Sequence, residues 1–365
     1  MSARDEVRPQ VTRSPTVTRP PISVAALRER IGAVPRVDLA WLPTPLQEMP
    51  RLSERLGVRL LMKRDDLTGL AFGGNKARSL EFRLAEALGA GADAIVAVLD
   101  LQSNSACQTA AAANRHGLET HLMLHGSARE WQGNLLVDAL LGADLQIAPS
   151  AAEAERAAAD VADRLRGEGR RVYSLNQGRM FALGSCLGYA LCAAEIVEQL
   201  ASKRTKATAI YLSSSGKSQA GVVLGALALG IEARVVGIAA RPAPEAASLV
   251  VATVRQATNL LELDVQLEAG DVRNFSGFAG ADYKAPSPKG LEALDLVARL
   301  EGVLLDTTYT AKAMAGLLDH IRTGNVRPGD SVVFIHTGGT PVLFAEAESL
   351  LSWRRGLVAG DAPGR

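Results

Sequence analysis

Short apolar runs rich in β-branched residues alternate with longer stretches of helical periodicity through most of this 365-residue chain. Apolar runs of this length are typical of strands buried on both faces, and the alternation is that of the βαβ unit. The sequence therefore predicts an α/β fold with parallel sheets covered by helices on both faces. The expected strands are 94–99, 121–124, 172–175, 209–213, 234–240 and 331–336, and the expected helices are 103–116, 131–141, 184–201 and 218–229.

The charges of the chain nearly cancel, with 40 Lys and Arg against 39 Asp and Glu. Such a balance provides no basic field that would attract nucleic acid or anionic lipid. Charges or glycines also interrupt every apolar run before it reaches the roughly 18 residues of a membrane span. We therefore expect a small-molecule partner, with no role for nucleic acid or a membrane.

The first 24 residues contain four arginines and four prolines and lack the apolar segment of a secretory signal. The prolines also oppose the amphipathic helix of an organelle-targeting peptide. We expect 1–24 to be a disordered tail and 353–365 a flexible one. The three cysteines, Cys107, Cys186 and Cys192, are too few and too uneven in number for a disulfide framework, which fits a cytoplasmic protein.

Two polar loops stand where ligands are expected in parallel sheets, directly after strands. Residues 102–105, Gln-Ser-Asn-Ser, follow the strand 94–99 and open a helix, whose free N–H groups can hold a carboxylate. Residues 213–221, Ser-Ser-Ser-Gly-Lys-Ser-Gln-Ala-Gly, follow the strand 209–213 and predict a cup for a phosphate. An ordinary N-cap explains the first loop equally well.

A third loop, Gly73-Gly74-Asn75-Lys76, places a lysine at the start of a predicted helix. Burial and the positive end of a helix both lower the pKa of a lysine, as covalent catalysis by an amine requires. Taken alone, a lysine after a Gly-Gly turn is more typical of a solvated first turn.

Two other patterns resemble chemical motifs without meeting their requirements. Gly216-Lys217-Ser218 ends like a Walker A loop, but Tyr211 stands where that motif needs its first glycine. His121 and His125 have the spacing of a helical metal pair, yet they bracket a strand-like run and no glutamate follows His121. We therefore expect neither a P-loop ATPase nor a metal site.

Five motifs, in order along the chain, resemble those of the D-cysteine desulfhydrase and 1-aminocyclopropane-1-carboxylate (ACC) deaminase family. The resemblance extends over about 42–345. The motifs are Gly73-Gly74-Asn75-Lys76, Gln102-Ser103-Asn104, Ser218-Gln219-Ala220-Gly221, the segment 306–316 around Tyr309, and His336-Thr337-Gly338-Gly339.

The resemblance implies fold type II of the pyridoxal-phosphate enzymes, in which two open parallel-sheet α/β domains hold the cofactor in the cleft between them. It places the large cofactor-binding domain at 25–78 and 178–352 and the small inserted domain at 79–177. It also implies a homodimer.

The same resemblance assigns roles to individual residues. Lys76 would bind pyridoxal 5'-phosphate covalently and later move the Cα proton of the substrate. Ser103, Tyr309 and Tyr283, which precedes Ala285-Pro286, would complete the catalytic group. Gln102, Ser103 and Asn104 would bind the substrate, and the other cofactor-binding residues would be Asn75, Asn104, Ser215, Gly216, Lys217, Ser218, Thr310 and Thr337.

Several positions depart from the family pattern. Ser105 and Cys107 replace a His and an Arg, and Lys217 replaces a small residue. Ring-opening deaminases of the family carry a Glu and a Leu where this chain has Thr310 and Thr337. Without a carboxylate at the pyridine nitrogen the electron sink is weaker.

Thr310 and Thr337 favour a lyase of amino-acid metabolism over an ACC deaminase, whereas the changes at Ser105, Cys107 and Thr307 keep a catalytically altered relative open. The favoured reaction is α,β-elimination on a small β-substituted amino acid such as D-cysteine, giving pyruvate, ammonia and sulfide. The alternatives are an ACC deaminase, and a catalytically altered relative that binds the cofactor in a biosynthetic or regulatory role.

Overall fold

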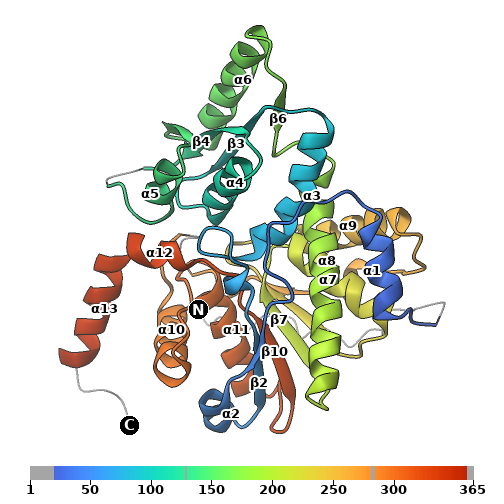
Figure 1. Cartoon of the computed structure of the whole chain (residues 1–365). Coiled ribbons are helices and arrows are strands. Elements are labelled where there is room, and N and C mark those ends of the chain that lie inside the picture. Colours follow the sequence, from blue (N-terminus) through green and yellow to red (C-terminus); the bar gives the residue numbers. More distant parts are fainter. Residues whose placement is uncertain (1–19, 128–129, 281–283, 360–365) are drawn as a thin grey trace.

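Two separate sheets organise the chain, which the computed structural model describes over 20–127, 130–280 and 284–359 (Figure 1). The larger sheet has the strand order β1-β2-β10-β7-β8-β9, and the smaller has the order β5-β4-β3-β6. The larger sheet consists of β1 (Leu46–Glu48), β2 (Arg59–Lys63), β7 (Ala209–Ser213), β8 (Arg234–Ile238), β9 (Arg273–Phe275) and β10 (Ser331–Ile335). The smaller sheet consists of β3 (Ala94–Asp100), β4 (Glu119–His125), β5 (Asp144–Ala148) and β6 (Val172–Ser174).

Every strand pair in the two sheets is parallel except β1 with β2. In the larger sheet Val332 of β10 pairs with Ala209 of β7, which in turn pairs with Arg234 of β8. The carboxyl ends of these neighbouring strands therefore lie at one edge. The predicted α/β architecture with parallel sheets is confirmed.

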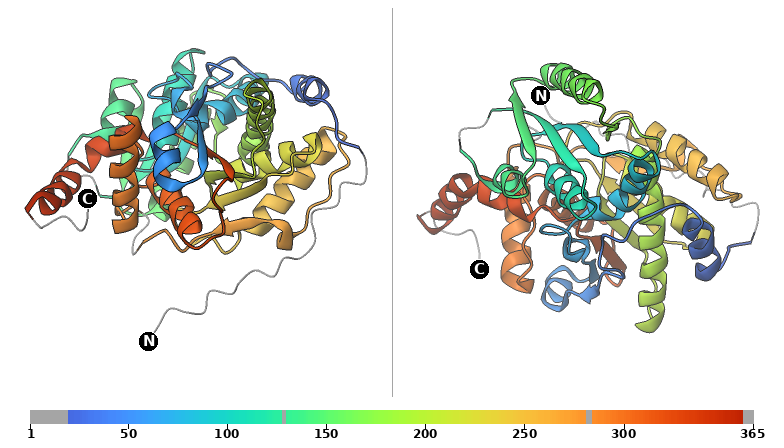
Figure 2. Two further views of the ribbon diagram at one scale, coloured as in Figure 1. Left: turned by 90° about the horizontal axis from the view of Figure 1, so that it is seen from below. Right: turned by 45° about the horizontal axis from the view of Figure 1, so that its top comes forward.

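Helices cover both faces of each sheet, so each sheet sits between apolar layers (Figures 1 and 2). One face of the larger sheet packs against α2 (Pro50–Leu56), α10 (Pro288–Glu301) and α11 (Thr310–Arg322). Its other face packs against α7 (Met180–Ser202) and α8 (Lys217–Leu229), which α1 (Val24–Gly32) and α9 (Ala246–Leu260) cover in turn. The smaller sheet has α3 (Asn75–Gly89), α4 (Asn104–Asn114) and α5 (Gly133–Leu140) on one face and α6 (Ala151–Gly167) on the other.

Helix α7 has the length and composition of a membrane-spanning helix, which sequence reasoning did not single out. Its most apolar window is 78% buried inside the protein, against α3, α8 and the larger sheet. Burial of this kind is typical of the central helix of a folded core. The expected start at 184 was late by four residues, since α7 begins at Met180.

The predicted division into domains stays a prediction, although the strands distribute as it proposes. Strands β3 to β6 lie within 79–177, whereas the six strands of the larger sheet lie outside it. Helix α3 crosses the boundary drawn at 78. The expected flexible tail from 353 is helical as far as the end of α13 (Ala347–Ala359), and residues 1–19 and 360–365 lie outside the described residues.

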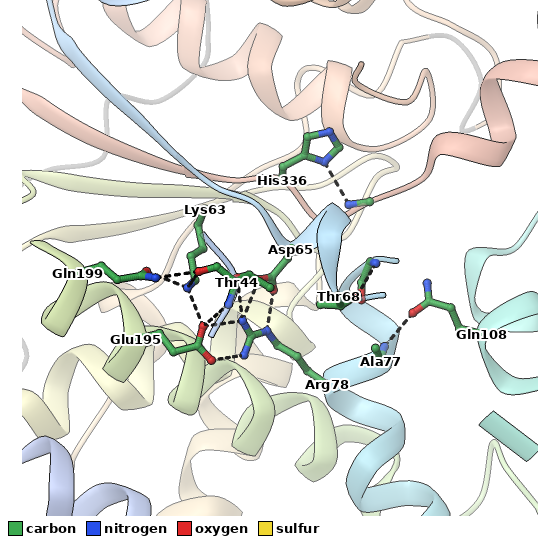
Figure 3. A network of polar contacts seen from close by, with 12 residues as sticks. Thr44, Lys63, Asp65, Thr68, Ala77, Arg78, Gln108, Glu195, Gln199 and His336 are labelled. Atoms are coloured by element: carbon green, nitrogen blue, oxygen red, sulfur yellow. Dashed lines mark hydrogen bonds and ion pairs between the residues drawn. The ribbon is translucent and has the colours of Figure 1, made fainter. Parts of the chain in front are cut away.

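A buried ionic network anchors the first turns of α3 (Figure 3). Arg78 donates to both carboxylate oxygens of Asp65, at 2.8 Å each, and to both oxygens of Glu195, at 2.7 and 2.9 Å. The Lys63 ammonium lies 2.6 Å from the same glutamate. Although burial raises the pKa of Asp65, the charge of Arg78 and its hydrogen bonds lower that pKa overall. Removing one partner of such a network typically costs about 3–5 kcal/mol, so α3 is held firmly in register.

Candidate active site

A cavity of about 250 Å³ opens where the carboxyl ends of β3, β7, β8 and β10 meet the start of α3. This is the place at which parallel sheets bind ligands. The cavity brings together the three loops that the sequence singled out. Its lining residues are Asn75, Lys76, Ser103, Asn104, Ser213, Ser214, Ser215, Lys217, Ser218, Ala240, Arg241, Leu249, Tyr309, Thr337 and Gly338.

The Gly-Gly turn lets the start of α3 approach β10 and α4 closely. Gly74 has φ +124°, and a Cβ there would lie 2.9 Å from Gln108 Nε2 and 3.1 Å from Thr337 O. Asn75 N donates to Thr337 O at 3.0 Å, and Ala77 N donates to Gln108 Oε1 at 2.8 Å. Only glycine permits this contact, and the two hydrogen bonds fix the backbone on either side of Lys76.

The amine of Lys76 has an altered proton affinity. Burial, followed by the charge of Arg83, lowers the pKa of Lys76 from 10.5 to about 8. The predicted depression is therefore present, and its second cause is a neighbouring cation. About a tenth of this amine is free base at pH 7, far more than an ordinary lysine has, and the free base is the form that acts as a nucleophile or a proton acceptor.

The serine-rich loop after β7 forms a concave turn at the start of α8. Gly216 has φ +126° and ψ −56°, and Ser214 Oγ accepts from the N–H groups of Gly216 and Gln219 at 3.0 and 3.2 Å. The first N–H groups of a helix have no acceptor within the helix, so those of Lys217 and Ser218 remain for an outside acceptor. A loop with this geometry suits an anion.

The potential of the cavity is positive. Three cations, Lys76, Lys217 and Arg241, line it, and no carboxylate belongs to its lining as far as the described residues show. Burial, then the charges of Lys76, Arg83 and Arg241, lower the pKa of Lys217 to about 7. Its Nζ lies 3.2 Å from the centroid of the Phe181 ring. A bound anion would relieve the repulsion among these cations.

The loop after β3 contributes Ser103 and Asn104 to the cavity. Ser103 is the N-cap of α4, and its Oγ accepts from Ser105 N at 3.2 Å. Asn104 Oδ1 accepts from Asn134 Nδ2 at 2.9 Å, so the NH₂ group is the end of the Asn104 amide that can serve a ligand. This segment therefore fits both interpretations of the sequence: it is an ordinary N-cap, and it also lines the cavity as a binding loop would.

Gln102 does not join the other predicted residues. Its Nε2 donates to Gln132 O at 3.0 Å and its Oε1 accepts from Asn134 N at 2.8 Å, which binds the side chain to the start of α5. It lines a neighbouring cavity of about 510 Å³, which meets the first one at Tyr309. The predicted role of Gln102 in binding a substrate carboxylate stays a prediction, and these bonds favour a structural role.

Tyr309 and Thr310 differ in their access to the cavity. Tyr309 is half-buried and lines both cavities. Thr310 is fully buried, does not belong to the lining, and donates its hydroxyl to Asp306 Oδ1 at 2.6 Å. The Asp306 carboxylate also accepts from the backbone N–H groups of residues 308, 309 and 310, at 2.8–2.9 Å. The predicted place of Thr310 beside the cofactor therefore lacks support from this geometry.

Sequence reasoning missed the contribution of β8 and α9. Ala240 and Arg241 follow β8, and Leu249 belongs to α9. The rule that ligands bind at the carboxyl ends of strands would have found Arg241, because the strand itself was predicted. Thr337 lines the cavity as expected, and Tyr283 lies outside the described residues.

Comparisons with known proteins identify the family of the chain. The family model of the pyridoxal-phosphate dependent enzymes matches residues 37–338. D-cysteine desulfhydrases from Yersinia enterocolitica and Serratia proteamaculans are 37% and 36% identical over 326 and 329 residues, covering 87% of this chain and 98% of each relative.

Solved structures show the same architecture. The crystal structure of an ACC deaminase homologue has a TM-score of 0.81 at 33% identity and covers 90% of this chain and 98% of its own. Threonine deaminase isoform 2 from Solanum lycopersicum, at 16% identity and a TM-score of 0.64, covers 94% of this chain and 93% of its own and supports the fold alone. The predicted fold type II architecture is confirmed, and the chain belongs to the pyridoxal-phosphate dependent enzyme family.

Proposed function

We propose that this enzyme catalyses α,β-elimination on a small β-substituted amino acid, with D-cysteine as the representative substrate. D-Cysteine and water would give pyruvate, ammonia and hydrogen sulfide. The observation that carries the proposal is that Lys76, with a pKa of about 8, shares one positive cavity with the anion-binding loop after β7. The similarity to two D-cysteine desulfhydrases over 98% of their length supports the choice of substrate.

The residues of the cavity fit pyridoxal phosphate. We assign the phosphate to the loop 214–218, where the free N–H groups and the Lys217 ammonium would meet its negative charge. The amine of Lys76 would hold the cofactor covalently, and the Asn104 NH₂ group would donate to the ring hydroxyl. Asn75 and Thr337 would border the ring. The excess of cations over carboxylates in the lining is what a dianionic group requires.

Bound pyridoxal phosphate supplies an electron-withdrawing ring that stabilises negative charge at the substrate Cα. The Nζ of Lys76 then accepts the Cα proton, which its lowered pKa permits near neutral pH. The N–H groups at the start of α4, together with the Ser103 hydroxyl, bind the substrate carboxylate. The Tyr309 hydroxyl, which borders both cavities, donates a proton to the departing β-substituent.

An ACC deaminase is the second candidate. It is favoured by the likeness to a solved ACC deaminase homologue at 33% identity over 90% of the chain. The lack of a carboxylate among the described lining residues, where the pyridine ring of the cofactor would lie, argues against this function. Thr337 lines the cavity, and the nearby Asp306 carboxylate is buried behind Thr310, with four hydrogen-bond donors.

Substrate preference tests the proposed function. Purified protein should be yellow, and it should release keto acid from D-cysteine or β-chloro-D-alanine at least about ten times faster than from ACC, because ring opening demands a deeper electron sink. Pyruvate and 2-oxobutyrate should be measured with lactate dehydrogenase, and the L-enantiomers provide the matched controls. Faster 2-oxobutyrate formation from ACC would favour the deaminase. Yellow protein that turns over none of these substrates would favour the catalytically altered relative.

The phosphate loop can be tested at Gly216. A Gly216→Ala change should raise the dissociation constant for pyridoxal phosphate about tenfold or more, because φ +126° and a Cβ 2.9 Å from Leu249 would force the loop to shift. The matched control is Gly302→Ala, which also has a positive φ (+66°) but meets nothing within 4 Å. Absorbance titration of the cofactor-free proteins measures the affinities. Equal affinity in both variants and the wild type would place the phosphate in another loop.

We propose a homodimer in the cytoplasm as the setting of this activity. Three exposed apolar side chains, Trp41, Leu67 and Phe72, border one groove, and a second copy of the chain would cover them. The three cysteines are free and buried, which suits a reducing compartment.

A further inference from the structure

Asn134, the second residue of α5, is fully buried and binds the loop that precedes and opens α4. Its backbone N–H donates to Gln102 Oε1 at 2.8 Å, and its Nδ2 donates to Gln102 O and Asn104 Oδ1 at 2.9 Å each. The Cys107 thiol donates to Asn134 Oδ1 at 3.2 Å. One amide therefore connects three residues of the segment 102–107.

The chemistry of the partners fixes the orientation of both amides. The backbone oxygen of Gln102 can only accept, so the NH₂ group of Asn134 must face it. The atom of Asn104 that lies 2.9 Å from this NH₂ group must then be the carbonyl oxygen. The NH₂ group of Asn104 is left for the cavity that Asn104 lines.

Cys107 contributes the first donor in this chain of contacts. Burial, followed by the charge of Asp138, raises the pKa of Cys107 far above its usual range, so the thiol keeps its proton. The thiol also lies 3.6 Å from Asn104 O, a longer contact than the one to Asn134. Cys107, one of the positions that depart from the family pattern, therefore helps to hold the Asn134 amide.

We propose that Asn134 is a positioning residue that acts through Asn104. The donor chain from Cys107 to Asn134 to Asn104 holds the Asn104 amide with its NH₂ group toward the ring hydroxyl of the cofactor. The inference rests on the proposed cofactor contact of Asn104. Because a neutral donor stabilises the deprotonated form of that oxygen, loss of the correct orientation raises the pH at which the bound cofactor changes its visible absorbance.

The test compares variants by their absorbance rather than by turnover alone. Asn104→Ala gives the reference shift of the pH midpoint, expected at about one unit upward for one lost hydrogen bond. Asn134→Asp keeps the shape but replaces the donor by acceptors, which turns the NH₂ group of Asn104 away from the ring. We expect at least half of the reference shift in Asn134→Asp and a shift in the same direction in Asn134→Ala. The uncharged variant Asn134→Ala decides the test, because a buried carboxylate raises the midpoint by its charge alone.

Asn114→Ala is the matched control, because Asn114 also joins α4 to α5, through Leu141 O at 2.7 Å, but does so at the opposite ends of these helices. Its pH midpoint should equal that of the wild type. If Asn104→Ala shifts the midpoint while Asn134→Ala does not, the positioning role is wrong and the proposed function stands. If Asn104→Ala itself causes no shift, Asn104 does not contact the ring, and both the positioning role and that part of the proposed site are overturned.

Discussion

Lys76→Ala should remove the covalent attachment of pyridoxal phosphate and lower elimination by more than about 10⁴-fold. The expected loss is this large because the same amine both binds the cofactor and moves the Cα proton. The visible absorbance of the holoenzyme should disappear and should not return with excess cofactor. In the wild type, the rate of attachment to cofactor-free protein should rise with pH and level off above about 8, where the Lys76 amine is mostly free base.

The fold should survive this change. The pKa of Lys76 in the folded protein is about 8, below its ordinary 10.5, so the protonated amine costs stability at neutral pH and its removal should not lower the unfolding midpoint.

Lys217→Met is the matched control, because it removes the other cavity lysine from the same cleft. It should weaken cofactor affinity and keep the visible absorbance at saturation. Normal absorbance in Lys76→Ala would assign the covalent bond to another lysine, with Lys63, Lys217 and Lys312 as candidates.

The fold was predictable where strands are apolar along their whole length. The run at 94–99 corresponds to β3 (Ala94–Asp100), which is buried between α4 and α6, and 209–213 matches β7 to the residue. Strand β5 (Asp144–Ala148) was missed because it pairs only with β4 at the edge of the smaller sheet, so that most of its residues are not buried. Strands β1 and β9 have three residues each, too few for any periodicity to be recognised.

The site was predictable as far as it depends on the ends of parallel strands. Asn104 and the loop after β7 each follow the carboxyl end of a predicted strand, and both line the cavity, although β3 and β7 belong to different sheets and Lys76 follows no strand. Gln102 could not have been placed, because its hydrogen-bond partners lie about 30 residues away on a helix that only tertiary packing brings near. The burial of Thr310 did leave a local signal. Asp306, four residues earlier, is a side chain that caps helix starts, and it captures the Thr310 hydroxyl.

Tyr309→Phe should lower the elimination rate by roughly 10²- to 10⁴-fold if the phenol donates the proton to the leaving group. The hydrogen bond from Tyr309 N to Asp306 Oδ2, 2.8 Å, belongs to the backbone and survives the change, so the start of α11 should keep its geometry. Cofactor affinity and the visible absorbance should therefore remain normal. The loss should appear in kcat with little change in KM, and it should be smaller for β-chloro-D-alanine, because chloride leaves without a proton.

The matched control for this experiment is Tyr173→Phe. Tyr173 lies in β6, outside both cavities, and its phenol donates a hydrogen bond to Glu86 at 2.5 Å. Its kcat should stay within about twofold of the wild type, since losses of surface or peripheral contacts act on stability before they act on chemistry. A Tyr309→Phe enzyme with the same kcat as Tyr173→Phe would make Tyr309 a packing residue. The proton would then have to come from one of the two cavity lysines, Lys76 or Lys217, whose pKa values are lowered to about 8 and about 7. Equal effects of Tyr309→Phe on D-cysteine and β-chloro-D-alanine would instead indicate that the hydroxyl orients the substrate, because an orienting contact serves both leaving groups alike.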